Sequence, residues 1–273
     1  MSEPILIIET EPSGLVWLRM NRPDRRNAFD DEMIDALSEG FTAVAQDTEV
    51  RAVALTGAGN AFSAGADLGW MQRMAGYSHD ENREDAVSLA EMLHLIATCP
   101  KPVIAAVNGP AIAGGAGLVA AADIAIGTPD AVFAITEVRL GLTPATISPY
   151  LLAAIGARAA RRYVLTAERF DAATARDLGL LHEIVPAGKL AERVRALAEA
   201  LAEAGPVALE AAKKLIRDVG TRAPDKALRA ETAERIAAIR VSPEGREGIA
   251  AFLEKRTPAW SRKGRPGKDQ GPT

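Results

Sequence analysis

A short apolar run that ends in a glycine-rich loop occurs twice in this chain, and no other feature constrains the fold as strongly. Val53–Thr56 precedes the loop Ala61–Leu68 (AFSAGADL), and Val103–Val107 precedes the loop Asn108–Leu118 (NGPAIAGGAGL). Apolar, β-branched runs of this length are typical of buried strands, and glycine, asparagine and proline end them. The pattern predicts two strands, each ending in a loop that opens a helix and leaves backbone N–H groups free.

Strand and helix patterns alternate through the first half of the chain. Ile5–Ile8 and Leu15–Met20 flank a Pro-Ser-Gly segment and predict a hairpin. Apolar residues then recur at helical spacing after Asp30, a suitable capping residue, and again across Asp80–Ala97. A short strand is expected near Ile124–Ile126. Alternation of this kind predicts an α/β core.

The pattern becomes helical beyond Pro144. Short helices are predicted over Ile147–Ile155, Ala157–Leu165 and Ala172–Leu178, and a last strand over Leu181–Val185. From Lys189 to Lys255 the chain is helical, with helix starts at Gly205-Pro206, Ala223-Pro224 and Ser242-Pro243. We expect residues 1–200 to form the core with the active site, 201–260 a helical lobe, and the polar segment 261–273 a disordered tail.

Composition excludes several classes of protein. With 273 residues, 48% of them hydrophobic, the chain can bury a sizeable core. A net charge of −4 gives no general attraction for nucleic acid or anionic membrane. The single Cys99 cannot form an internal disulfide, which predicts a reducing compartment. We find no charged-then-apolar leader and no apolar run long enough to cross a bilayer, so we expect a cytoplasmic protein.

Other catalytic motifs are poorly supported. Gly114–Gly117 lacks the G-x-G-x-x-G spacing of a dinucleotide loop, and the chain has no P-loop motif and no G-x-S-x-G elbow. His79, His94 and His182 are scattered, without metal-ligand spacing. We therefore expect no metal and no cofactor.

The two loops and one acid point to chemistry on a carbonyl group. Two free N–H groups that converge from the two loops would form an oxyanion hole, which stabilises negative charge developing on a carbonyl oxygen. Glu137, in FAITEVRLGL, could then move a proton. Taken singly, each loop would also fit a helix cap or a nucleotide loop, and Glu137 would fit an ion pair with Arg139.

The order of these motifs resembles a known family. NRPDRRNAF, AFSAGADL, KPVIAAVNGPAIAGGAGLVAAADIAI and EVRLGL follow one another as in the crotonase, or enoyl-CoA hydratase/isomerase, superfamily, over Ile5–Trp260. Stretches such as DLGWMQRMAGYSHDEN and RVSPEGREGIAAFLEKRTPAW are similar to bacterial methylglutaconyl-CoA and isohexenylglutaconyl-CoA hydratases. The resemblance implies a spiral of repeated ββα units, a C-terminal helical trimerisation lobe, a homotrimer or a dimer of trimers, and an acyl-CoA substrate that brings its own coenzyme A.

The resemblance also implies roles for individual residues. The oxyanion-hole donors match the N–H groups of Ala66 and Gly114, and Glu137 matches a catalytic glutamate. The substrate-binding positions are Arg26, Ala64, Asp67, Leu68, Gly117 and Lys255. Among them, Ala64 and Leu68 would flank the adenine, while Arg26 and Lys255 would approach the phosphates and the nucleotide end, Lys255 in some relatives from a neighbouring subunit.

One position departs from typical hydratases of the family, which carry a second glutamate where this chain has Gly117. We expect the missing side chain to leave room for a branched or carboxylated acyl group, with Arg73, Arg83 or Arg139 as the partner of its carboxylate. The predicted activity is hydration of a 2-enoyl-CoA thioester, 3-methylglutaconyl-CoA or a related glutaconyl-CoA, as in leucine degradation or fatty acid metabolism. The alternatives are a Δ3,Δ2-enoyl-CoA isomerase and an RNA-associated or non-catalytic crotonase homologue.

Overall fold

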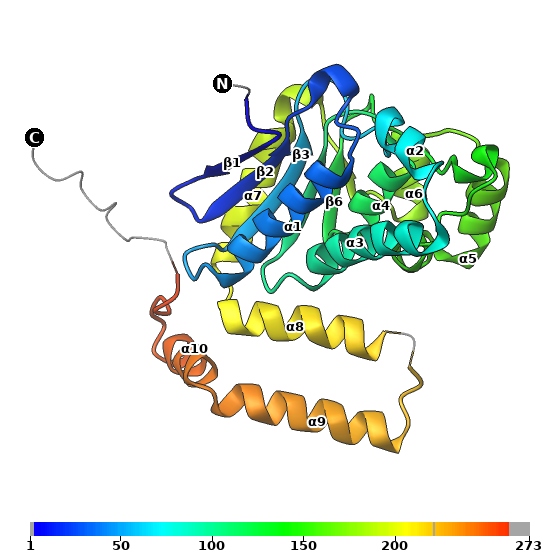
Figure 1. The fold of residues 1–273 in the computed structure, drawn as a ribbon. Coiled ribbons are helices and arrows are strands. Elements are labelled where there is room, and N and C mark those ends of the chain that lie inside the picture. The colour runs from blue at the N-terminus through cyan, green and yellow to red at the C-terminus, as the bar shows by residue number, and fades with distance from the viewer. Residues whose placement is uncertain (1–2, 221, 262–273) are drawn as a thin grey trace, which may run out of the picture.

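The computed structural model describes residues 3–220 and 222–261, which form a layered α/β core and a helical lobe (Figure 1). The strands of the large sheet are β1 (Leu6–Thr10), β2 (Leu15–Met20), β3 (Ala52–Gly57), β4 (Val103–Val107), β6 (Ile124–Gly127) and β9 (Glu183–Ile184), in the order β1-β2-β3-β4-β6-β9. A small sheet contains β5 (Ala111–Ile112), β7 (Val132–Ala134) and β8 (Phe170–Asp171).

The large sheet has the predicted hairpin at one edge and is otherwise parallel. β1 and β2 pair antiparallel, with Leu6 opposite Met20. From β2 onward each strand pairs parallel with the next in the order. Every residue of β3 and β4 is buried. Central parallel strands are covered by helices on both faces, which is why these two runs are continuously apolar.

Seven helices belong to the core as described. They are α1 (Asp31–Gln46), α2 (Leu68–Met74), α3 (His79–Thr98), α4 (Gly114–Ala121), α5 (Ser148–Thr166), α6 (Ala172–Leu178) and α7 (Leu190–Ala202). Side chains alternate across the sheet: Leu55 and Ala105 pack with α1, α3 and α4, whereas Ala54 and Ile104 pack with α7. The fold thus places α3 and α4, and with them the glycine-rich loops, on the face opposite α7.

Local sequence signals fix two helix boundaries in the core. The Asp30 carboxylate accepts a hydrogen bond from the Met33 N–H and caps α1, as predicted. Gly156, with φ of 71° and ψ of 159°, interrupts α5, so the two short helices expected on either side of it are present as two halves. A non-glycine residue adopts such a positive φ only with strain, which makes glycine the natural residue at the break.

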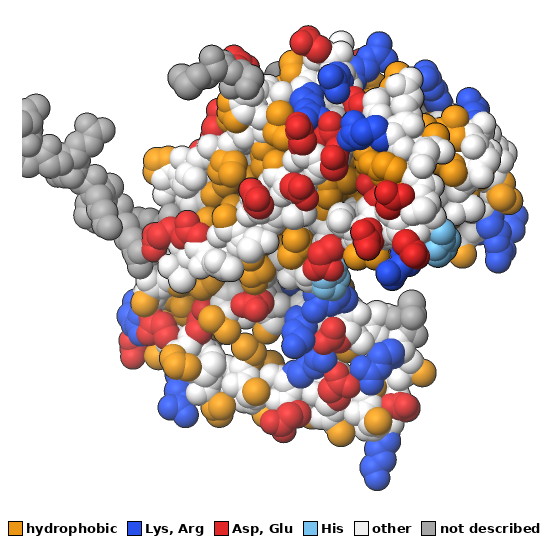
Figure 2. Space-filling model, in the orientation of Figure 1, with side chains coloured by type: hydrophobic (Ala, Val, Ile, Leu, Met, Phe, Trp, Pro, Cys, Tyr) orange, Lys and Arg blue, Asp and Glu red, His pale blue; other side chains and the backbone are white. Residues whose placement is uncertain are grey.

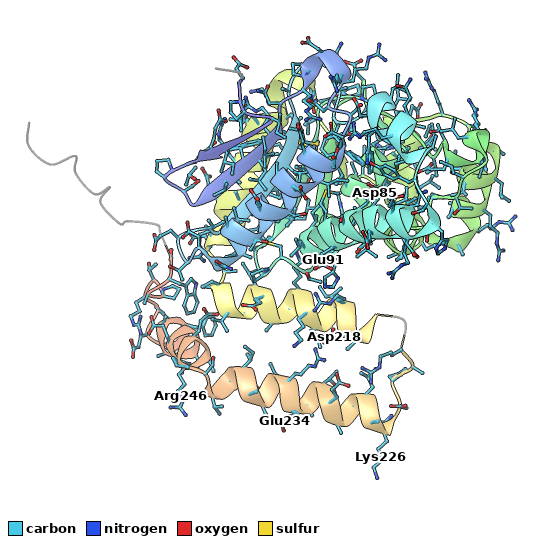
Figure 3. All side chains as sticks on the ribbon, viewed as in Figure 1. Asp85, Glu91, Asp218, Lys226, Glu234 and Arg246 are labelled. Atoms are coloured by element: carbon cyan, nitrogen blue, oxygen red, sulfur yellow. The ribbon has the colours of Figure 1, made fainter. Side chains whose placement is uncertain are left out.

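The C-terminal lobe stands off from the sheet. It contains α8 (Pro206–Val219), α9 (Lys226–Val241) and α10 (Pro243–Leu253), and Figure 1 shows α8 and α9 side by side below the core. Asp218, labelled in Figure 3, faces α9 and forms an ion pair with Arg235 at 2.7 Å. The Lys213 Nζ donates to Asp123 at 2.6 Å and thereby ties α8 to the core.

Much of the lobe surface is apolar and exposed. No residue of α8 is buried, and Leu228 and Ala251 are the buried residues recorded for α9 and α10. Ile216 is 71% exposed and Phe252 82%, and Figure 2 shows such apolar side chains among charged ones on the lower part of the molecule. Trimerisation through this lobe stays a prediction.

Two boundaries differ from those expected. The α9 helix begins after Asp225, whose carboxylate accepts from the Leu228 N–H, and not at Pro224. Ser261 is buried, and its hydroxyl contacts the Glu203 carboxylate at 3.1 Å, so the predicted disordered tail cannot begin there. The rest of that predicted tail, 262–273, lies outside the described residues.

Candidate active site

A cavity of about 390 Å³ opens between α2, α3 and the segment 136–147. Its wall includes all three predicted catalytic residues, Ala66, Gly114 and Glu137, together with Ala64. Trp70, Met71, Met74 and Leu89 are among the apolar residues of the wall. A site of this composition accommodates an apolar group and orients it with a few polar atoms.

Backbone contacts hold the two glycine-rich loops together. The Ile112 N–H donates to the Ser63 carbonyl at 2.9 Å, and a Cβ built at Gly65 would lie 3.5 Å from the Gly114 nitrogen. Within the described residues, the N–H groups of Ala66 and Gly114 make no hydrogen bond. Gly114 is the first residue of α4, and the first N–H groups of a helix lack a partner within it. Both predicted donors are therefore available to a carbonyl oxygen in the cavity.

Phe29 sets the positions of both loops. Its N–H donates to the Gly65 carbonyl at 2.8 Å, and its own carbonyl accepts from the Asp67 N–H at 2.9 Å. Its ring covers Gly114 so closely that a Cβ there would lie 2.3 Å from the Phe29 Cζ. Glycine is thus required at 114 by close packing against the ring that supports the neighbouring loop.

Glu137 supplies a buried carboxylate oxygen to the site. It begins a 3₁₀ turn, Glu137–Leu140, and its Oε2 is buried with no hydrogen-bond partner among the described residues. Burial raises the pKa of Glu137, against the opposing effect of hydrogen bonds from its own N–H and that of Thr136. The described ion pairs include none between Glu137 and the exposed Arg139. A buried carboxyl with a raised pKa suits proton transfer near neutral pH.

The remaining predicted binding residues differ in their placement. The Arg26 carbonyl accepts from the Ala64 N–H at 2.9 Å, so Arg26 lies beside the loop with its side chain exposed. Leu68, at the start of α2, is 77% exposed. Lys255 follows α10, which Figure 1 shows far from α2, a helix of the cavity wall, within this chain. Contact of Lys255 with the substrate of a neighbouring subunit stays a prediction.

Asp67 has a structural role that the resemblance did not indicate. Its carboxylate caps α2 by accepting from the N–H groups of Gly69 at 2.8 Å and Trp70 at 3.3 Å, and it pairs with Arg25 at 3.1 Å. Burial acts to raise the pKa of Asp67, but these bonds and the arginine outweigh it and keep the pKa below its ordinary value. The carboxylate therefore fixes the loop that carries Ala66.

The expectation of open space beside Gly117 is wrong. A Cβ built at Gly117 would lie 2.2 Å from the Ile147 Cγ2 and 2.7 Å from its Cβ. Ile147 is buried and forms part of the cavity wall, whereas Gly117 lies behind it in α4. The Ile147 side chain, from a distant part of the sequence, fills the space that a side chain at position 117 would occupy. No room remains beside Gly117 for a branched acyl group.

The expected cation for a substrate carboxylate is also absent from the described wall. Arg73 forms an ion pair with Asp31, and Arg83 and Arg139 are exposed; none of these three arginines lines the cavity. The charged residues that do line it are Glu137 and Asp85. Asp85 was not among the predicted site residues, because the helical spacing across Asp80–Ala97 indicates the apolar face and gives no signal for which acid reaches a cavity.

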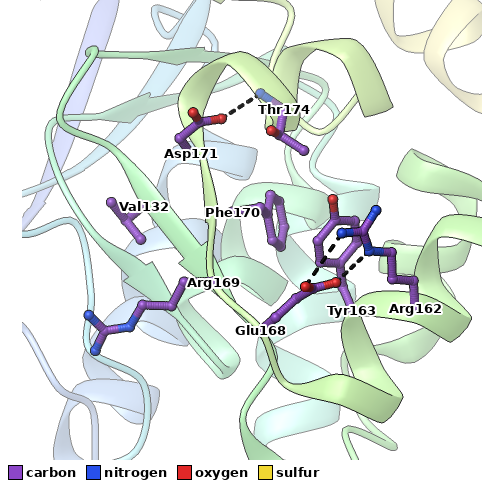
Figure 4. Close-up of a pocket in the computed structure, with 8 residues that line it drawn as sticks. All are labelled: Val132, Arg162, Tyr163, Glu168, Arg169, Phe170, Asp171 and Thr174. Carbon is purple, nitrogen blue, oxygen red and sulfur yellow. Dashed lines mark hydrogen bonds and ion pairs between the residues drawn. The ribbon is translucent and has the colours of Figure 1, made fainter.

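A second, more open pocket lies beside β8 (Figure 4). Arg162 pairs there with Glu168, and the Asp171 carboxylate caps α6 by accepting from the Thr174 N–H at 2.8 Å. Both carboxylates of this pocket are thus already bonded. Glu137, by contrast, has an unpartnered oxygen, so the cavity beneath α2 is the better candidate for catalysis.

Among residues 3–220 and 222–261, no three His, Cys, Asp or Glu side chains are grouped so that they could hold a metal ion, and none of the helices combines the length and apolar character needed to span a membrane. The absence of a cofactor and the cytoplasmic location stay predictions.

Known proteins are similar to this chain over nearly its whole length. A family model described as enoyl-CoA hydratase/isomerase matches residues 10–263. A solved enoyl-CoA hydratase of Shewanella pealeana is 39% identical, with a TM-score of 0.91 over 94% of this chain and 96% of that one. An enoyl-CoA hydratase of Mycobacterium tuberculosis is 34% identical over 92% of this chain and 97% of its own length. The 1,2-epoxyphenylacetyl-CoA isomerase of Escherichia coli is 34% identical over 94% and 98%.

Proposed function

Because the chain belongs to the enoyl-CoA hydratase/isomerase family, whose crotonase fold it shares, we propose that it adds water to the double bond of a 2-enoyl-CoA thioester. The observation that carries this proposal is the Glu137 carboxylate, whose Oε2 is buried without a described hydrogen-bond partner, in the same cavity wall as the N–H groups of Ala66 and Gly114. A proton-transfer group and an oxyanion hole are the two parts that this reaction requires.

The reaction follows from these three residues. The thioester oxygen accepts hydrogen bonds from the Ala66 and Gly114 N–H groups, which draws electrons from the double bond. Water attacks C3 as Glu137 removes one of its protons, so that a C3–O bond forms and the negative charge moves to the thioester oxygen as an enolate. Glu137 then returns the proton to C2, and the enolate collapses to the 3-hydroxyacyl thioester. One carboxyl thus acts first as base and then as acid, which a raised pKa favours.

The charges of the cavity wall bear on which acyl group the substrate carries. The sequence resemblance predicts 3-methylglutaconyl-CoA, whose acyl chain ends in a carboxylate. The described wall offers that carboxylate no cation and presents Asp85 and Glu137 instead. An unpaired charge buried among like charges is costly. We therefore propose a CoA thioester with an uncharged acyl chain as the substrate, in preference to 3-methylglutaconyl-CoA.

An isomerase is the second candidate, because Gly117 stands where typical hydratases of the family carry a second glutamate, which leaves Glu137 to move the proton. Moving a double bond from C3 to C2 requires one mobile proton, and Glu137 alone could remove it from C2 and return it to C4. The description of the matching family model includes isomerases as well as hydratases.

A side-by-side turnover assay on crotonyl-CoA, 3-methylglutaconyl-CoA and 3-hexenoyl-CoA tests both candidates. We expect the wild type to hydrate crotonyl-CoA and Glu137→Gln to lose about 10²-fold or more, the scale of a positioned acid–base group. Glu84→Gln, an exposed acid on α3, is the control and should retain full activity. Hydration undiminished in Glu137→Gln would refute the proposal, and isomerisation much faster than any hydration would favour the second candidate.

A further inference from the structure

We infer that Asp85 selects the acyl group: it disfavours chains that end in a negative charge and favours chains whose far end is uncharged or donates a hydrogen bond. The inference rests on the proposed function, because it concerns the acyl chain of a CoA thioester bound in the same cavity. It deepens that function by assigning specificity to a residue that plays no part in the proton transfer.

Asp85 is held in the cavity wall by a residue of another helix. It lies on α3, as labelled in Figure 3, and its side chain is half-buried. The indole Nε1–H of Trp70, on α2, donates to the Asp85 Oδ1 at 2.9 Å. Trp70 is 3% exposed and therefore fixed by packing. The carboxylate is thus a positioned group that links two helices of the wall, unlike a mobile surface acid.

The second oxygen of Asp85 is available to a ligand. Among the described contacts, Oδ1 bonds to Trp70, while Oδ2 has neither a hydrogen bond nor an ion pair. Arg73, whose positive charge acts on Asp85, is already paired with Asp31. An ionised carboxylate accepts hydrogen bonds and donates none, so Oδ2 can bind a hydroxyl, amide or ammonium group but not another carboxylate.

Charge and packing act in the same direction. Met71, Met74 and Leu89 supply apolar contacts for the methylene groups of an acyl chain. An acyl carboxylate would add a third negative charge to a wall that holds Asp85 and Glu137 and, as described, no basic side chain. Repulsion between like charges a few ångströms apart in a partly buried site is strong enough to change relative affinity about tenfold or more.

A pair of substrates of equal length tests the inference. 2-Hexenoyl-CoA and 2,3-dehydroadipyl-CoA both carry six-carbon acyl chains, which end in a methyl group and a carboxylate respectively. We expect the wild type to prefer 2-hexenoyl-CoA, and Asp85→Asn to raise the ratio of kcat/KM for 2,3-dehydroadipyl-CoA over 2-hexenoyl-CoA about tenfold or more. Glu84→Gln removes an exposed charge one residue away and should leave the ratio unchanged.

Two outcomes would overturn the inference. An unchanged ratio in Asp85→Asn would mean that the carboxylate does not sense the acyl end, and a lowered ratio would mean that it binds the substrate carboxylate.

Circular dichroism checks that Asp85→Asn folds. If it does not fold, Asp85→Ser serves as a second neutral variant. Titration calorimetry with the unreactive hexanoyl-CoA and adipyl-CoA gives the same comparison without turnover. Failure of the proposed function would appear as no hydration of any thioester, while these binding ratios would still decide the role of Asp85.

Discussion

Close packing between Gly117 and Ile147 yields a prediction about stability that can be worked out atom by atom. In Gly117→Ala the new Cβ would lie 2.2 Å from the Ile147 Cγ2 and 2.7 Å from its Cβ, whereas the Cδ1 is 3.7 Å away. Overpacking of this kind lowers the free energy of unfolding by about 1–3 kcal/mol. Alanine in place of glycine inside a helix raises it by roughly 0.5–1 kcal/mol, so the net loss is smaller than the clash itself.

A double-mutant cycle isolates the clash from the helix effect. Ile147→Ala removes the Cγ2 and by itself costs about 2–5 kcal/mol as a large-to-small core substitution. In that background the 2.2 Å contact is gone but the 2.7 Å contact with the Cβ of residue 147 remains, so Gly117→Ala should cost less than in the wild type, with a coupling energy of about 0.5–3 kcal/mol. Ile147→Val keeps both atoms that clash and loses only the distant Cδ1, so it is the matched control and should show no relief.

Urea unfolding of the four proteins at one protein concentration measures this coupling. The same cycle applies to Gly117→Glu. The new carboxylate should fit into the folded protein only when Ile147 is also replaced by a small residue. Additivity of Gly117→Ala and Ile147→Ala to within about 0.5 kcal/mol would refute the argument, because residues in contact must couple.

Three further predictions concern the site and the core. Glu137→Gln should unfold at a higher urea concentration than the wild type at pH 8 but not at pH 4. The pKa of Glu137 in the folded state is raised above 4.5, so the ionised carboxylate destabilises the fold as pH rises through that range. A gain in stability that is the same at both pH values would contradict this. Gly114→Ala should lower kcat at least about tenfold by displacing the Phe29 ring, and adding Phe29→Leu should restore part of the lost kcat. Full activity of Gly114→Ala alone would argue that the Phe29 ring does not require glycine at 114. Cys99 is buried and its pKa is raised by burial, so it should react with a thiol reagent slowly until urea unfolds the chain; rapid reaction of the folded protein would show that the thiol is accessible.

Elements with a strong local signal could be predicted from the sequence. β3 and β4 are uninterrupted apolar runs, and the structure has them as buried parallel strands. The two halves of α5 follow from a single Gly156. β5 and β8 have two residues each and β7 three, which is too short for an alternating pattern to appear, so the small sheet was missed.

The errors at the site arise from contacts between distant residues. Ile147 fills the space beside Gly117 although thirty positions separate them, and no local pattern reports that contact. Asp85 has the sequence context of an exposed helix face and becomes part of the cavity only because α2 places Trp70 against it. Arg73, Arg83 and Arg139 had the right sign of charge and suitable sequence positions, but an ion pair to Asp31 and exposed locations keep them out of the wall.

The division between sheet and lobe has a consequence for how the chain is made. Every described strand lies between Leu6 and Ile184, so a ribosome releases the whole sheet before α8, α9 and α10. Because domains fold in the order of their synthesis, the sheet can close while the last helices are still in the exit tunnel. Those helices then emerge with Ile216 and Phe252 uncovered, so the nascent chain exposes this apolar surface, and with it a risk of aggregation, after all described residues of the cavity wall have been synthesised.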